Sequence, residues 1–148
     1  MPVEVQIAAA SVTPPPAAIE GWALGALEGA DGGSGDICVR VVDDDEGRRL
    51  NRDFRQRDVP TNVLSFPADV DVPELDILGD IVICAGVVAR EAAEQGKPYE
   101  HHFAHMVVHG VLHLLGYDHE SAAEAAAMET LEAEILGRFG IEDPYGEG

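Results

Sequence analysis

Four of the six histidines in this 148-residue chain fall within one short stretch, HMVVHGVLHLLGYDHE, at positions 105–120. His109 and His113 have the i, i+4 spacing that puts two side chains on the same face of a helix. Two imidazoles placed in this way can share one metal ion, and imidazole suits zinc and several other transition metals. The stretch therefore indicates a metal site built on a helix.

The choice of ligands needs more than this spacing, because every neighbouring pair in the histidine stripe from 101 to 113 repeats it. One ion cannot bind three successive members, since the outer two lie about 12 Å apart along the helix axis. Gly116 can take the left-handed conformation that ends a helix, and the returning chain would bring His119 back to the helix. We predict that His109, His113 and His119 bind one Zn²⁺ ion, although the spacing does not distinguish zinc from another transition metal.

The other histidines are expected to have different roles. His105 is predicted to form hydrogen bonds beside the metal rather than to bind it. His101 and His102 are predicted to be exposed residues at the start of the helix.

Three protein ligands would leave one position of a tetrahedral zinc ion open for water, as in catalytic rather than structural sites. Zinc lowers the pKa of bound water to about 7, and that water can attack a carbonyl or a phosphorus. Gly110 stands where the metallopeptidase pattern H-E-x-x-H has its glutamate, and a glycine would keep the backbone open near the ion. Asp118, Glu120 and Asp80 are candidate bases, and the sequence does not choose among them.

Local patterns predict the elements that must position these residues. Apolar and β-branched runs predict strands at 3–8, 37–43, 62–66 and 78–84. Apolar periodicity predicts an amphipathic helix across DDEGRRLNRDFRQ and further helices at 15–29, 85–95, 99–115 and 121–138. Pro67 should end its strand or confine it to a sheet edge, and Ser121 and Glu124 have the spacing of a capping box.

This order predicts a single α+β domain over residues 1–148, in which a small mixed β-sheet of about four strands is covered by helices. The length is that of one domain. The histidine helix at 99–115 is apolar around most of its circumference, so we expect it to be the central, buried, metal-binding helix.

Charge is distributed unevenly along the chain. The formal net charge is −19, which argues against strong nucleic-acid binding because phosphate affinity comes from Lys and Arg. Six of the nine basic residues nevertheless lie between positions 40 and 57, whereas positions 120–148 hold eight acidic residues and one arginine. The net charge therefore does not decide the partner.

The cysteines and the N-terminus indicate a location. Cys38 and Cys84 lie in apolar β-like runs and are expected to be buried free thiols of a reducing compartment. The N-terminus lacks a basic region, and no apolar run approaches the ~18 residues of a membrane span. We therefore expect a cytoplasmic protein with no membrane association.

The segment HGVLHLLGYDH at 109–119 resembles the H-G-x-L-H-L-x-G-Y-D-H signature of the YbeY-type endoribonucleases, which are rRNA maturation factors. Two further segments agree with this family in order and spacing, NRDFRQRDVPTNVLSFP at 51–67 and LGDIVIC at 78–84. Both the three-histidine signature and PTNVLSFP are specific. The first 35 residues agree with the family only in general layout.

The resemblance implies a metal-dependent endoribonuclease that acts on single-stranded RNA, in 3′-end maturation of small-subunit rRNA and in ribosome quality control. It implies zinc on His109, His113 and His119, and an important arginine that falls on Arg55. A guanidinium binds phosphate through two parallel hydrogen bonds and can stabilise charge at phosphorus. The implied partners are single-stranded RNA or rRNA and the ribosome or its associated proteins, and no DNA is expected. PTNVLSFP is expected to form a wall of the cleft that meets the RNA strand.

Two other functions fit parts of the pattern. A zinc metallopeptidase would use the same H-x-x-x-H pair, but Gly110 removes the usual general base. A ribosome-assembly or interaction module would hold its metal structurally and use the acidic helix at 121–138 for docking. A structural ion has four protein ligands and its removal unfolds the domain, whereas loss of a catalytic ion leaves a folded protein.

Overall fold

The computed structural model describes residues 3–30, 35–59, 61–67, 77–117 and 120–145. Its elements follow the predicted order: β1 (Val3–Ile7), α1 (Pro16–Gly29), β2 (Asp36–Val42), α2 (Asp44–Arg55), β3 (Val63–Pro67), β4 (Ile77–Cys84), α3 (Ala85–Gln95), α4 (Tyr99–Leu114) and α5 (Ala122–Gly137). The predicted α+β class is confirmed. Among the helices in the described ranges, none combines the length and the apolar composition that crossing a membrane requires.

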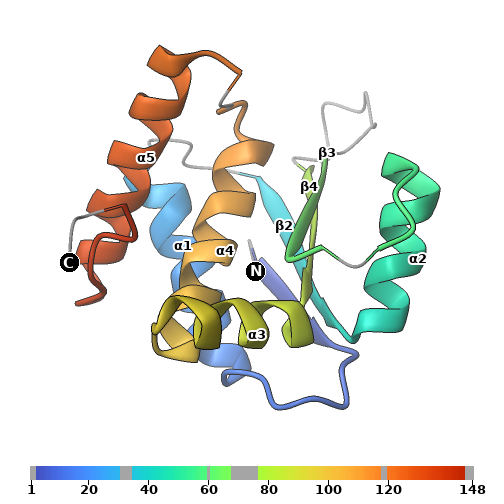
Figure 1. The fold of residues 1–148 in the computed structure, drawn as a ribbon. Coiled ribbons are helices and arrows are strands. Elements are labelled where there is room, and N and C mark those ends of the chain that lie inside the picture. Colours follow the sequence, from blue (N-terminus) through green and yellow to red (C-terminus); the bar gives the residue numbers. More distant parts are fainter. Residues whose placement is uncertain (1–2, 31–34, 60, 68–76, 118–119, 146–148) are drawn as a thin grey trace.

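The four strands form one sheet in the order β1-β2-β4-β3. β1, β2 and β4 run parallel, and β3 pairs antiparallel with β4 at the edge of the sheet. Pro67 has no backbone N–H to donate and is the last residue of this edge strand, as predicted. Figure 1 shows α1, α4 and α5 on one side of the sheet and α2 on the other.

β4 is covered on both faces, which explains its nearly continuous apolar sequence. Ile81 and Ile83 are fully buried in the main core with α4. Val82 and Cys84 point the other way and belong to a second cluster with residues of α2. The alternation means that neighbouring residues of β4 serve opposite sides of the sheet.

The two cysteines are free thiols, as predicted. Cys84 is buried, and this burial raises the pKa of its thiol to about 11. Cys38 is only half-buried, so the expectation that both thiols are buried is wrong for this residue.

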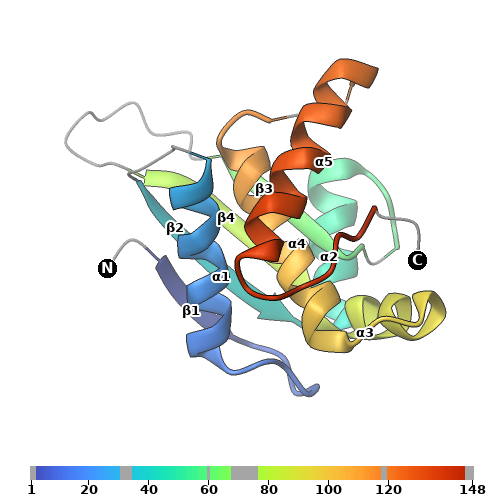
Figure 2. The same ribbon diagram turned by 90° about the vertical axis from the view of Figure 1, so that its left-hand side faces the viewer.

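α4 is the central helix, as predicted, and packs against α1, α3, α5, β3 and β4. Figure 2 views the molecule from the side of α1 and α5, behind which the strands lie. The helix ends at Leu114, and Gly116, two residues further on, has a φ of +99°. The N–H of Gly116 donates to the His113 carbonyl, and the N–H of Tyr117 donates to the Leu112 carbonyl, both at 3.0 Å. This left-handed termination confirms the predicted turn after His113.

Gly110 lies where α4 packs directly on the sheet. A Cβ at this position would be 2.9 Å from Ile81 Cγ2 and 3.3 Å from Val63 Cγ2. The Ser65 hydroxyl donates a hydrogen bond to the Gly110 carbonyl at 3.1 Å. The glycine therefore permits close approach of helix and sheet. Our expectation that it keeps space open near the ion is wrong, because this position faces the sheet.

Gly110→Ala is expected to lower the free energy of unfolding by about 1–3 kcal/mol, because the added methyl group overpacks the helix–sheet contact. Urea-induced unfolding followed by circular dichroism measures this change. Gly21→Ala in α1 is the control, since a Cβ there meets nothing within 4 Å. The control should keep or raise stability by up to about 1 kcal/mol, and equal effects of the two changes would contradict the close contact.

Candidate metal centre

His109 and His113 lie one turn apart on the same face of α4. Their Nε2 atoms are 3.0 Å apart, and their ring centroids are 4.5 Å apart. Two nitrogens bound to one tetrahedral zinc ion at its usual bond lengths would be about 3.3 Å apart. The observed spacing fits a shared ion with a small adjustment, and these are the two helical members of the predicted ligand set.

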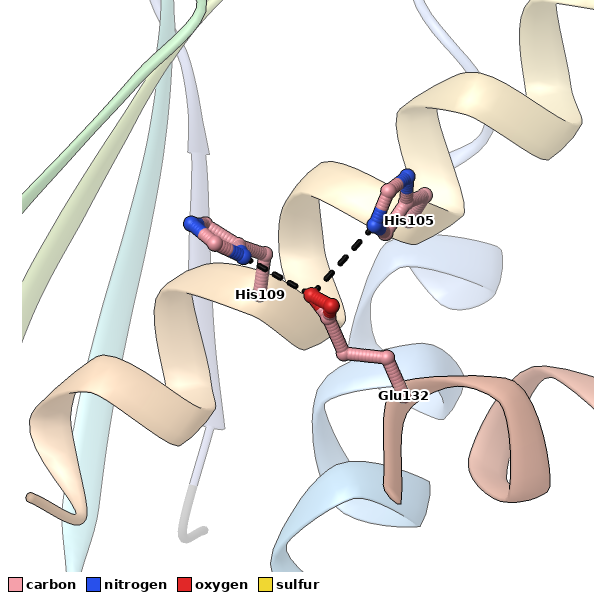
Figure 3. Close-up of side chains that lie close together, drawn as sticks. All are labelled: His105, His109 and Glu132. Carbon is pink, nitrogen blue, oxygen red and sulfur yellow. Dashed lines mark hydrogen bonds and ion pairs between the residues drawn. The ribbon is translucent and has the colours of Figure 1, made fainter. Parts of the chain in front are cut away.

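The buried carboxylate of Glu132, on α5, contacts the other side of His109. Its Oε1 is 2.8 Å from His109 Nδ1 and 3.3 Å from His105 Nε2, as Figure 3 shows. The hydroxyl of Tyr145 donates to Oε2 at 2.8 Å. Glu132 has no exposed surface, so these hydrogen bonds replace the water that its charge would otherwise require. The predicted hydrogen-bonding role of His105 is confirmed.

These hydrogen bonds also determine which nitrogen of His109 carries the proton. Burial by itself raises the pKa of Glu132, but the hydrogen bonds from His105 and His109 outweigh it and lower the pKa to about 2. The carboxylate is therefore ionised at neutral pH and can only accept hydrogen bonds. His109 donates from Nδ1, which leaves the Nε2 lone pair on the side of His113. Metal-binding histidines are commonly oriented by a carboxylate in this way.

His109 thus separates two positions that could hold a metal ion. On its Nδ1 side, one ligand atom each from His105, His109 and Glu132 lie within 4.8 Å of one another. On its Nε2 side, it faces His113. An ion on the Nδ1 side would replace the hydrogen bond between His109 and Glu132, whereas an ion on the Nε2 side would leave that bond in place.

A cavity of about 570 Å³ adjoins the Nε2 side of the histidine pair. Arg55, the last residue of α2, lines this cavity together with His109 and His113, so the structure brings these predicted residues to one space. Arg55 is exposed, and it forms no ion pair with any residue that the structure describes, whereas Arg48 pairs with Asp58 at 2.8 Å. The remaining lining residues are Thr61, Asn62, Val63, Ser65 and Glu120.

The other predicted residues divide into three groups. His119, the predicted third ligand, and Asp118 lie outside the described residues. Glu120 lines the cavity and keeps its place as a candidate base. Asp80 lines a different cavity on the α2 side of the sheet, so the expectation that it could serve the histidine site is wrong. The reason is the alternation along β4, in which the next residue, Ile81, faces α4.

His102 is buried with 4% of its surface exposed, and His101 is half-buried, so the prediction that both are exposed is wrong. His102 Nε2 is 3.0 Å from Glu91 Oε1, and the Asn62 side-chain amide donates to the same carboxylate at 3.1 Å. Asn62 Oδ1 accepts from the N–H of Val63 at 2.7 Å. This network anchors the start of β3 and hence one wall of the cavity.

Glu132, Glu91 and Asn62 were not predicted as parts of the site. Glu132 follows Met128 by four positions and precedes Leu136 by four, so it lies on the buried stripe of α5. A carboxylate in a buried stripe predicts that a partner lies beside it, because acidic residues are almost never fully buried without one. The sequence alone does not identify that partner.

Known proteins resemble this chain over most of its length. A family model described as Endoribonuclease YbeY matches residues 22–140. The chain is 61% identical over 137 residues to the endoribonuclease YbeY of Alkalilimnicola ehrlichii, covering 89% of this chain and 82% of that protein. It is 52% identical over 147 residues to that of Stutzerimonas stutzeri, covering 98% and 91%. A solution structure of a Thermotoga maritima protein is 28% identical, with a TM-score of 0.62, covering 97% and 99%.

Glu132→Ala is expected to lower the free energy of unfolding by about 1–3 kcal/mol, because it removes the acceptor that the buried His105 and the half-buried His109 share. Urea-induced unfolding measures the loss. The control is Glu134→Ala, an exposed position of the same helix, where a change within about 0.5 kcal/mol is expected. If both variants unfold alike, the carboxylate network does not contribute to stability.

Proposed function

Because this chain belongs to the YbeY endoribonuclease family, we propose that it is a metal-dependent endoribonuclease that cleaves single-stranded RNA. The observation that carries the proposal is the cavity that Arg55 shares with His109 and His113. It combines a permanent cation, which suits phosphate, with a pair of imidazoles, which suits a transition metal.

The proposed metal ligands are His109, His113 and His119. The chemistry of the first two fits, since their Nε2 atoms are close together and Glu132 fixes the proton of His109 on Nδ1. When bound, Zn²⁺ or a similar ion would supply Lewis-acid activation of water and of a phosphate oxygen. Glu132 keeps the His109 ring oriented, because its hydrogen bond does not use Nε2.

Arg55 is proposed to bind the scissile phosphate. Its guanidinium can donate two parallel hydrogen bonds to phosphate oxygens and can stabilise the negative charge that grows during attack. Glu120 is the proposed acceptor of the proton that the attacking water loses. Ser65 is not assigned as a nucleophile, because its hydroxyl already donates to the Gly110 carbonyl.

The edge strand β3 supports an extended, single-stranded substrate. Thr61, Asn62 and Val63 lie along the cavity wall at the start of this strand. β3 pairs only with β4 in the described sheet, so its outer edge is available to an extended chain.

We further propose that the substrate is the 3′ end of small-subunit rRNA and that the enzyme contributes to ribosome quality control in the cytoplasm. A net charge of −19 does not favour strong independent RNA binding. The ribosome, or a protein bound to it, would therefore supply part of the affinity and present the RNA. We propose no DNA partner, because the family model that matches the chain is described as an endoribonuclease.

Two observations bear on the other functions. A glutamate at position 110, as a metallopeptidase has, would project into Ile81 and Val63 rather than toward the histidine pair. The metallopeptidase is therefore disfavoured. An assembly module with a structural metal would use the group of His105, His109 and Glu132 and would need a fourth protein ligand beside it. Metal analysis distinguishes this arrangement from the proposed one.

His113→Ala is expected to reduce zinc affinity by more than about 100-fold, since even hydrogen-bond partners of a ligand contribute about 10–100-fold. His105→Gln should leave one zinc per chain, because His105 is not a ligand in the proposed arrangement. Zinc content after dialysis and competition with a chelator measures both, with circular dichroism as the check on folding. The reverse pattern would assign the ion to His105, His109 and Glu132 and would overturn the proposed site.

Purified wild-type protein is expected to cleave single-stranded RNA, and His113→Ala is expected to abolish the cleavage. Arg55→Ala should lower kcat by about 100- to 1,000-fold, the effect of removing one donor that stabilises transition-state charge. Arg57→Ala is the matched control, because Arg57 is also exposed but does not line the cavity. Equal cleavage by wild type and His113→Ala would identify the activity as a contaminant.

A further inference from the structure

Phe54, which is exposed, and Phe66, which is half-buried, form an aromatic pair on the opposite side of β3 from the histidines. Phe54, on α2, is 63% exposed, which is high for a large apolar side chain. Its ring centroid is 5.0 Å from that of Phe66 on β3, with the ring planes at 67°. The pair is therefore held in a defined edge-to-face geometry while much of Phe54 remains open to solvent.

The pair borders a cavity of about 460 Å³ between α2 and the sheet, with Leu50 and Val82 among its apolar lining residues. Its charged lining residues do not suit a phosphate. Arg40 is paired with Glu46 through bonds of 2.7 and 3.1 Å, and the remaining acid, Asp80, would repel an anion. The chemistry suits a flat, uncharged group that can donate a hydrogen bond to a carboxylate.

The end of α2 and the edge strand β3 contribute residues both to this cavity and to the histidine cavity. Phe54 and Arg55 are consecutive, so their Cα atoms are about 3.8 Å apart, yet Phe54 lines one cavity and Arg55 lines the other. Ser65 and Phe66 of β3 divide between the two cavities in the same way. A strand whose phosphate contacts Arg55 would therefore have a neighbouring base within reach of Phe54.

We propose that Phe54 and Phe66 form a stacking platform for a nucleobase of the RNA strand whose phosphate binds Arg55. The inference rests on the proposed function and adds a base-binding subsite to it. Stacking on an aromatic side chain contributes about 1–3 kcal/mol per base and tolerates any sequence. The exocyclic amino groups of adenine and cytosine can donate a hydrogen bond, and the Asp80 carboxylate can accept it. A subsite of this kind would supply affinity that does not depend on net positive charge.

The test is the affinity of the full-length protein for a fluorescein-labelled, 2′-O-methylated oligoadenylate, which resists cleavage, measured by fluorescence anisotropy. Phe54→Leu keeps apolar surface but removes stacking, and it should weaken binding by about 5- to 150-fold. Phe54→Trp keeps stacking and should retain affinity, and the fluorescence of this variant should fall when the oligonucleotide binds. Val12→Ala, at a residue that is 84% exposed and not part of either cavity, should bind like wild type.

Unchanged affinity of Phe54→Leu would overturn the platform. Equal weakening by Phe54→Leu and Phe54→Trp would also overturn it, since the effect would then not come from stacking. Cleavage by the wild type that is lost in His113→Ala tests the endoribonuclease separately. The platform can therefore fail while the enzyme function stands.

Discussion

The close packing of α4 on the sheet at Gly110 sets the distance between the histidine pair and the edge strand β3. A side chain there would press on Ile81 and Val63, so the helix could not lie as near to the edge strand. That closeness puts the histidine pair of α4 and the wall formed by the start of β3 on one cavity. Arg55 reaches the same cavity from α2, across the edge of the sheet. The chemistry of the site is thus a consequence of helix–sheet distance.

Glu132 complements this packing by fixing the histidines electrostatically. A fully buried charge is costly unless it is hydrogen-bonded, and here three donors from α4 and the C-terminal segment satisfy it. Burial beside Glu132 also raises the pKa of Tyr145, so its hydroxyl stays protonated and donates. These hydrogen bonds orient the imidazole of His109, and its Nε2 faces His113 before a ligand binds.

Much of this arrangement could be predicted from the sequence, because it depends on local patterns. Hydrophobic periodicity indicated the order of elements and the buried helix, and Gly116 indicated the turn after His113. The wrong predictions concern which side of the sheet or helix a residue faces. Gly110 and Asp80 both face away from the histidine pair, and which way a residue faces depends on how helix and sheet pack. Glu132 was missed because its partners lie on another helix, and burial of a charge becomes interpretable only once those partners are known.

The alternation along β3 has a consequence for the register in which this strand pairs with β4. Val63 and Ser65 serve the histidine cavity, whereas Leu64 and Phe66 pack on the α2 side. Because side chains in a strand alternate with a period of two, a slip of one residue would exchange these faces completely. A slip of β3 by one residue against β4 would therefore turn Phe66 toward the histidines and Ser65 toward α2. Packing on both faces of β3 therefore specifies the register in which it pairs with β4.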